Sequence, residues 1–161
     1  DQYDIMMSPL SLSTPAPVYF NLNHILSMVR VRIVTNAFTA SELEDMSITL
    51  NNFVLQGSAS ITTGLATGTN TRSDITPYTH VASQEYSALV MPQTIAANTP
   101  VVTVTLREYQ NVPFVGTLNA GLTFVPGKEN VITVTLLKTA IQISATLEDW
   151  APGTTGSVTI Q

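Results

Sequence analysis

Strict two-residue alternation between residues 141 and 148 is the feature that most limits how this chain can fold. The odd positions are apolar and the even positions are polar, in the order Ile141, Gln142, Ile143, Ser144, Ala145, Thr146, Leu147 and Glu148. Successive side chains of a strand point to opposite faces, so this pattern predicts a strand with one buried and one solvated face. The rest of the chain must supply the sheet against which the buried face packs.

Two further strands are predicted directly before this one. Leu122 to Val125 alternates, turn-forming residues occupy 126–130, and Val131 to Leu137 is rich in β-branched side chains, which suit a pleated surface. We therefore expect residues 121–150 to form a three-stranded meander. Trp150, at the end of the last strand, is expected to plug one end of a sandwich.

The remainder of the chain also reads as short strands, near residues 3–7, 18–24, 29–33, 48–50, 53–61, 86–91, 101–109 and 157–161. The apolar side chains change from even to odd positions between His24 and Met28, which predicts a bulge, a tight turn or a helical half-turn there. Their parity changes again at Asn51-Asn52, which we interpret as a turn. Residues 36–45 and 62–74 are polar and predict loops. No apolar residues recur at helical spacing over three turns, and about nine to eleven strands with regular turns predict an all-β sandwich of short antiparallel strands.

Composition limits the classes of function. With 161 residues the chain is most simply a single domain spanning 1–161, and only 11% of its residues are charged, against about 25% in an average domain. The net charge of −5 and the scattered basic residues argue against a nucleic-acid partner and against an anionic membrane surface. There is no cysteine and no apolar run of 18 residues, which excludes thiol chemistry and predicts no membrane insertion. Asp1 resembles the start of a mature or excised fragment.

The residues that could act in catalysis or bind a metal lack the neighbouring residues that such sites require. His24 and His80 are the only histidines, and neither has a ligand-type neighbour two or four positions away. We interpret His24 as a partly buried histidine hydrogen-bonded to the backbone. The acidic groups at 42–45 and 148–149 lack both the calcium-loop spacing and the facing geometry of glycosidase carboxylates. We therefore predict no enzyme activity, no cofactor and no metal.

Aromatic side chains leave a binding role open. Five of them are candidates for a sugar-binding platform, namely Tyr78, Tyr86, Tyr109, Phe114 and Trp150. Each has an ordinary structural alternative, and the sequence does not place any two of them on one surface. A carbohydrate-binding sandwich, such as an adhesin module, is therefore the alternative function.

Three stretches together resemble one known family, and the first of them is the opening segment at residues 3–10 (YDIMMSPL). Residues 20–33 (FNLNHILSMVRVRI) and residues 126–150 (PGKENVITVTLLKTAIQISATLEDW) are similar to strand motifs of the fimbrillin family, the FimA/Mfa-like subunits of Bacteroidales type V pili. Five positions carry the motifs and are expected to be structural: His24, Leu26, Gly127, Lys128 and Trp150. Asn130, Ile132 and Leu147 depart from the usual residues, and the middle of the chain carries no resemblance.

The resemblance implies a transthyretin-like, Greek-key β-sandwich, corresponding to the C-terminal domain or a trimmed fragment of a two-domain lipoprotein precursor. It also implies a location at the cell surface, in the outer membrane or an extracellular pilus. The expected partners are other pilin subunits, together with a host or bacterial surface glycan or protein. Family subunits polymerise by strand exchange, in which a donor strand completes the neighbour's sheet. The candidate donor strand here is Gly156, Ser157, Val158, Thr159, Ile160 and Gln161, which could equally fold back onto its own sheet.

Overall fold

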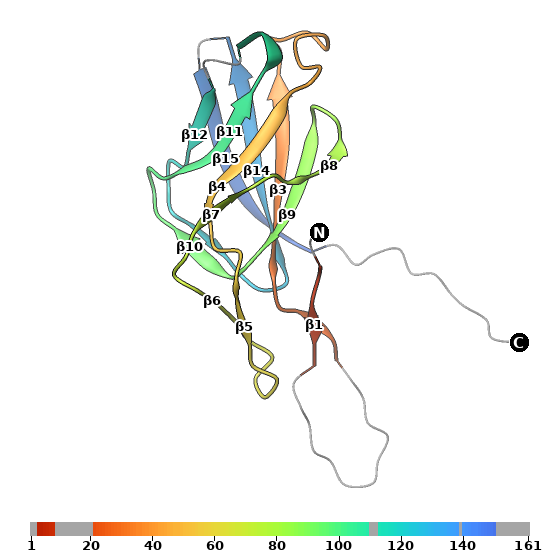
Figure 1. Ribbon diagram of the computed structural model, residues 1–161, viewed down its shortest axis with the longest axis vertical. Helices are drawn as coiled ribbons and strands as arrows, with labels where there is room; N and C mark the ends of the chain where they lie inside the picture. Colours follow the sequence, from red (N-terminus) through yellow and green to blue (C-terminus); the bar gives the residue numbers. More distant parts are fainter. Residues whose placement is uncertain (1–2, 9–20, 110–112, 139, 151–161) are drawn as a thin grey trace, which may run out of the picture.

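Two packed β-sheets make up the body of the protein in a computed structural model that describes residues 3–8, 21–109, 113–138 and 140–150 (Figure 1). The five-stranded sheet has the order β15 (Ala140–Asp149), β14 (Lys128–Leu137), β3 (Ser27–Thr35), β9 (Glu85–Val90) and β8 (Tyr78–Val81). The four-stranded sheet has the order β12 (Phe114–Thr117), β11 (Pro100–Thr105), β4 (Ser47–Phe53) and β7 (Ser73–Ile75). The predicted all-β sandwich is confirmed.

Three short pairs extend the two sheets. β1 (Met6–Met7) pairs with β2 (Asn23–His24), β5 (Gly57–Ala59) with β6 (Ala66–Gly68), and β10 (Gln93–Ile95) with β13 (Leu122–Phe124). A single 3₁₀ turn, η1 (Arg107–Tyr109), follows β11. The β1–β2 and β5–β6 pairs project from the lower end of the body in Figure 1.

The core lies between the two sheets and is built from alternate residues of their strands. The fully buried side chains include Val29, Val31, Leu50, Phe53, Val102, Val104, Phe124, Ile132, Val134 and Leu136. Phe53 and Phe124 meet edge to face, with ring centroids 5.3 Å apart. Each large side chain removed from water in this way contributes roughly 1.5–3 kcal/mol. The alternation seen in the sequence therefore builds the core, except at Leu147, which was predicted to be buried and is 53% exposed at the end of β15.

The centre of the five-stranded sheet is a parallel pair, which departs from the predicted antiparallel arrangement. β14 runs parallel to β3, with Arg30 opposite Val131 and Arg32 opposite Thr133. Every other pairing between described strands is antiparallel. Parallel neighbours need a long crossover connection, and here it consists of the whole middle of the chain.

The three-stranded meander predicted for residues 121–150 is wrong in its first strand. β14 and β15 form the expected antiparallel hairpin, with Ile132 opposite Ala145. β13 instead pairs with β10, through Thr123 and Thr94, in a separate ladder. The turn after Phe124 carries the chain from one ladder to another, so strands that are adjacent in sequence are not neighbours in a sheet.

The two changes of buried parity have different structural causes. Between His24 and Met28 the strand is interrupted at Ile25 and Leu26, so β2 and β3 belong to different sheets. The predicted irregularity is confirmed. The turn predicted at Asn51-Asn52 is wrong, because β4 continues through both residues. Asn52 has a φ of +64°, and the register with β7 shifts between Leu50 and Phe53. This bulge brings Leu50 and Phe53, three positions apart, onto the same buried face.

The two predicted loops also differ in outcome. Residues 36–45 form turns, one of which begins with a reciprocal cap: the Thr39 amide donates to Oε2 of Glu42 at 2.8 Å, and Thr39 Oγ1 accepts from the Glu42 amide at 3.4 Å. The loop predicted for residues 62–74 is wrong in part, because that range contains β6 and the start of β7.

Candidate functional site

The five motif residues converge at the lower end of the sandwich, where β2, β14 and β15 approach one another. The Gly127 amide donates to the Leu26 carbonyl at 2.9 Å, and Lys128 forms an ion pair with Asp149, the residue opposite it at the open end of the β14–β15 hairpin. Trp150 stacks on His24, with ring centroids 3.9 Å apart and ring planes 15° from parallel. These contacts tie the chain just before β3 to both strands of the β14–β15 hairpin at its open end. The structural role assigned to the motif remains a prediction.

His24 has a different partner from the one predicted. Its side chain is 32% exposed, as expected for a partly buried histidine, but Nδ1 lies 2.7 Å from Oδ2 of Asp4 rather than next to a backbone carbonyl. The imidazole therefore links the β1 segment, through Asp4, to Trp150 at the end of β15. No signal in the sequence paired Asp4 with His24, because the two residues are distant in the chain.

Gly127 is expected to tolerate no side chain without loss of stability. Its φ of +66° lies in the left-handed region, and a Cβ there would come within 3.4 Å of the His24 carbonyl oxygen. Gly127→Ala should therefore reduce the free energy of unfolding by about 1–2 kcal/mol, measured by urea denaturation. Gly121→Ala is the control, because its Cβ would lie 3.5 Å from the nearest atom and its φ is not positive. Equal losses in the two variants would contradict the prediction.

A hollow with aromatic walls lies beside the motif residues, and it is called here the aromatic hollow. It has a volume of about 660 Å³ and is lined by Tyr3, Asp4, Met28, Thr76, Pro77, Tyr78, Ser87, Leu89 and Trp150. The side chains of Tyr3 and Tyr78 are 75% and 67% exposed, so both tyrosine rings are accessible to a ligand.

The structure divides the five aromatic candidates among three places. Tyr78 and Trp150 meet at the aromatic hollow. Tyr109 and Phe114 pack edge to face around Phe38, with centroids about 6 Å apart. Tyr86 is only 5% exposed; burial raises the pKa of its hydroxyl, which accepts a hydrogen bond from the Ser83 amide at 3.0 Å. Tyr3, for which the sequence carries no binding signal, joins the first group.

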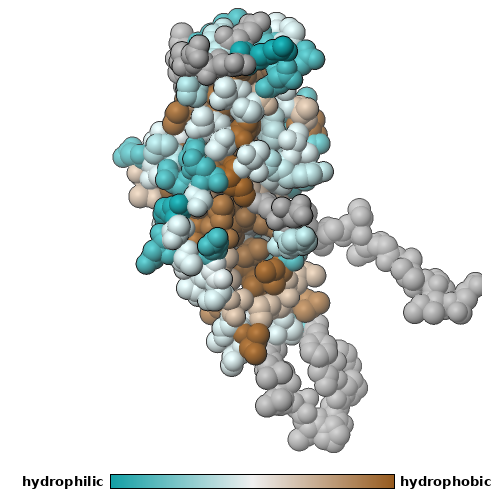
Figure 2. Space-filling model, viewed as in Figure 1, coloured by the Kyte–Doolittle hydropathy of each residue, from teal (hydrophilic) through white to brown (hydrophobic). Residues whose placement is uncertain are grey.

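An apolar groove opens next to the aromatic hollow and shares two of its lining residues. It has a volume of about 700 Å³ and is lined by Tyr3, Ile5, Leu26, Leu55, Gln56, Gly57, Ile75, Leu89, Val90 and Met91. Hydrophobic side chains run down the middle of this face of the molecule (Figure 2). The groove therefore lies along the side of the sandwich where β7 of one sheet approaches β9 of the other.

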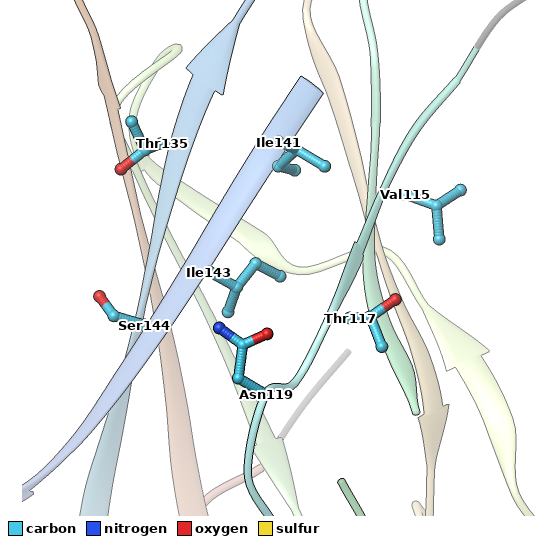
Figure 3. A pocket seen from close by; sticks show the side chains of 7 residues that line it. All are labelled: Val115, Thr117, Asn119, Thr135, Ile141, Ile143 and Ser144. Carbon is cyan, nitrogen blue, oxygen red and sulfur yellow. The ribbon is translucent and has the colours of Figure 1, made fainter. Parts of the chain in front are cut away.

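A third hollow marks the opposite side of the sandwich, where β12 and β15 form the edges of their sheets. It is lined by Val115, Thr117, Asn119, Thr135, Ile141, Ile143 and Ser144 and has a volume of about 620 Å³ (Figure 3). A methyl group on Gly116 of β12 would overlap Cδ1 of Ile143, so the two edge strands are in close contact here. The hollow therefore lies over the contact between these two edge strands.

A charged cluster crosses three strands of the five-stranded sheet. Arg30 on β3 forms ion pairs with Glu129 on β14 and with Glu85 on β9. Burial alone would lower the pKa of Arg30, but its bonds to the two carboxylates raise that pKa above its ordinary value. Glu129 is only 6% exposed, so Arg30 neutralises a carboxylate that water barely reaches.

The acidic groups considered in the sequence also have partners. The backbone amide of Thr39, together with the Lys138 ammonium 3.0 Å away and the Thr39 hydroxyl, lowers the pKa of Glu42 to about 2. Asp45 lies 2.8 Å from Arg107. Among the described residues, no group of three or more histidines and carboxylates could hold a metal, and no helix is long and apolar enough to cross a bilayer.

A family model described as fimbrillin-like matches residues 1–150. The chain belongs to the fimbrillin-like family. The resemblance identified in the two end motifs is thus confirmed, and the match also includes the middle of the chain, where the sequence motifs gave no support. A comparison with curated protein sequences finds no match.

Solved structures share the fold of this fimbrillin-like chain. A candidate cell adhesion protein from Bacteroides uniformis has 22% identity and a TM-score of 0.67, over 83% of this chain and 54% of that one. A second, from Bacteroides ovatus, has 21% identity and a TM-score of 0.64, over 84% and 49%. The tip fimbrial protein Mfa3 of Porphyromonas gingivalis has 12% identity and a TM-score of 0.51, over 80% and 52%. The chain therefore spans about half the length of these relatives.

Proposed function

We propose that this chain is one β-sandwich domain of a subunit, or an accessory protein, of a cell-surface pilus that supports adhesion. The observation that carries the proposal is the fimbrillin-like family match over residues 1–150. Structural likeness to the tip fimbrial protein Mfa3 and to candidate adhesion proteins supports it at the level of the fold. The corresponding location is the outer surface of the cell.

We further propose that the subunits assemble by strand exchange, with the apolar groove as the acceptor. Ile75 of β7 and Val90 of β9 come from different sheets, yet both line the groove. The groove is therefore an opening between the two sheets that is bordered by apolar side chains. An added strand could place alternate apolar side chains in such an opening while its backbone bonds to a sheet edge. The proposed occupant is the terminal segment of a neighbouring subunit.

The candidate donor strand, Gly156 to Gln161, lies outside the described residues. Its sequence supports the role, because Val158 and Ile160 alternate with polar neighbours and could anchor on one face. This assignment predicts that apolar anchors at positions 158 and 160 are needed for assembly, whereas the residue between them is not.

Deleting Gly156–Gln161 in the full-length precursor should abolish surface fibres, imaged by negative-stain electron microscopy. Val158→Asp with Ile160→Asp should do the same, because charged side chains cannot enter an apolar groove without a partner. Thr159→Asp is the matched control and should leave the fibres intact. Undiminished fibres in the deletion would exclude the donor role, provided that surface labelling shows equal export of each variant.

A further inference from the structure

The aromatic hollow has the chemical features of a ligand site, and two of its aromatic side chains, Tyr78 and Trp150, do not line the apolar groove proposed as the strand acceptor. Two exposed tyrosine rings, from Tyr3 and Tyr78, and the indole of Trp150 line it together with a carboxylate and two hydroxyl groups, those of Asp4, Thr76 and Ser87. Its volume of about 660 Å³ falls within the usual range for small-molecule sites, about 300–1,000 Å³. We propose that this hollow binds a neutral hexose residue of a surface glycan, stacked on Trp150 and Tyr78.

Both stacking rings are held in place by a histidine. Trp150 lies flat against His24, at 3.9 Å and 15°, and His24 Nδ1 is in turn 2.7 Å from Asp4. Tyr78 meets His80 edge to face at 4.9 Å, and His80 Nε2 lies 2.7 Å from Ser87 Oγ. The chain's two histidines thus each support one wall of the same hollow. A ring that is already fixed loses little conformational entropy when a ligand stacks on it, which favours binding.

The polar groups beside these rings fit the hydroxyl groups of a sugar. Asp4 Oδ2 lies 2.7 Å from His24 Nδ1, and a carboxylate has enough lone pairs to accept hydrogen bonds from a ligand as well. Ser87, opposite Tyr78 in the β8–β9 register, and Thr76 add hydroxyl groups that can donate or accept. Apolar walls with a few placed polar groups are the usual composition of a specific small-molecule site.

Charge distinguishes a neutral sugar from other ligands. Among the described residues that line the hollow, Asp4 is the one charged residue, and they include neither lysine nor arginine to bind a phosphate, a sulfate or a carboxylate. Acidic sugars would be repelled by Asp4 and by the net charge of −5. A quaternary ammonium ion could also use aromatic rings and a carboxylate. A sugar fits better than this cation, because the hollow is large and its hydroxyl groups need hydrogen-bonding partners. A quaternary ammonium ion is small and has no hydrogen-bonding groups.

Trp150 is the chain's single tryptophan, so its fluorescence reports directly on the hollow. The full 161-residue chain should be screened on an array of neutral and acidic glycans, and each hit titrated as a free oligosaccharide. A neutral hexose-containing glycan should change the Trp150 emission saturably. Tyr78→Ala should weaken this binding by about tenfold, which corresponds to the loss of about 1.4 kcal/mol of stacking.

Two controls make the result decisive. Tyr78→Phe keeps the ring and should bind within about threefold of the unchanged chain, whereas Ile61→Ala removes an exposed apolar side chain on the β5–β6 hairpin and should have no effect. Tyr78 is exposed, so its variant should fold normally, and circular dichroism checks this. No neutral-glycan hit, a hit unaffected by Tyr78→Ala, or saturable binding of tetramethylammonium alone would each overturn the proposal. None of these outcomes bears on fibre assembly, which the donor-strand deletion tests separately.

Discussion

Ile143→Asp is expected to lower the free energy of unfolding by about 3–4 kcal/mol, because it places an unpaired charge in the core. Ile143 is 8% exposed and packs from β15 against Gly116 of β12, closing the side of the sandwich where the two sheet edges meet. Neither Gly116 nor Val134, which lies opposite Ile143 on β14, has a basic side chain that could pair with the new carboxylate. Urea denaturation, followed through circular dichroism, measures the loss.

Thr146→Asp on the same strand is the matched control. Thr146 points away from the core and is exposed, so a carboxylate there remains hydrated. Its cost should stay within about 0.5 kcal/mol. If the two substitutions destabilised the protein equally, the assignment of the inner and outer faces of β15 would be wrong.

Arg30→Ala should be the most damaging change on the outer face of the five-stranded sheet. It removes the partner of Glu129, whose side chain is 7% exposed, and leaves a nearly buried carboxylate without a counter-charge. Losing one partner of a buried pair costs about 3–5 kcal/mol; because the Arg30 side chain is 22% exposed, we expect about 2–3 kcal/mol. Urea denaturation at neutral pH is the measurement.

A nearby arginine and a second substitution separate the possible causes. Arg32, two positions along β3, is 48% exposed and lies 4.0 Å from Glu148, so Arg32→Ala should cost less than about 0.5 kcal/mol. Adding Glu129→Gln to Arg30→Ala should recover part of the loss, because a neutral amide is easier to bury than a carboxylate. No recovery would mean that Arg30 acts through packing rather than through charge.

The sequence predicted strands well wherever side-chain alternation was clear, because burial of one face is a local property. β3, β11, β14 and β15 all lie within or close to their predicted ranges. Pairing partners were not predictable in this way. The parallel contact between β14 and β3 depends on where the intervening chain goes, and no residue of either strand encodes it. β5 lies within the strand predicted for residues 53–61, but its partner β6 was missed because two of its three residues, alanine and glycine, are depleted in strands.

Predictions for the candidate site were limited by the same cause. The motif residues His24 and Trp150 were identified separately, and only the fold stacks one ring on the other. Tyr78 and Trp150 were both named as ligand candidates, yet their meeting at one hollow follows from the position of β8 at the edge of its sheet. Asp4 belongs to the opening stretch that resembles the family, but nothing in the sequence predicted its contact with His24.

The parallel pair at the centre of the five-stranded sheet has a consequence for how the domain is made. Ser27 Oγ donates to the Lys128 carbonyl, which is 101 positions further along the chain. During synthesis β3 is therefore finished long before β14 exists, and loop closure over such a distance makes folding slow. Until residue 128 emerges, one edge of β3 offers its unpaired backbone groups to any other strand, so a truncated or stalled chain would be prone to aggregate.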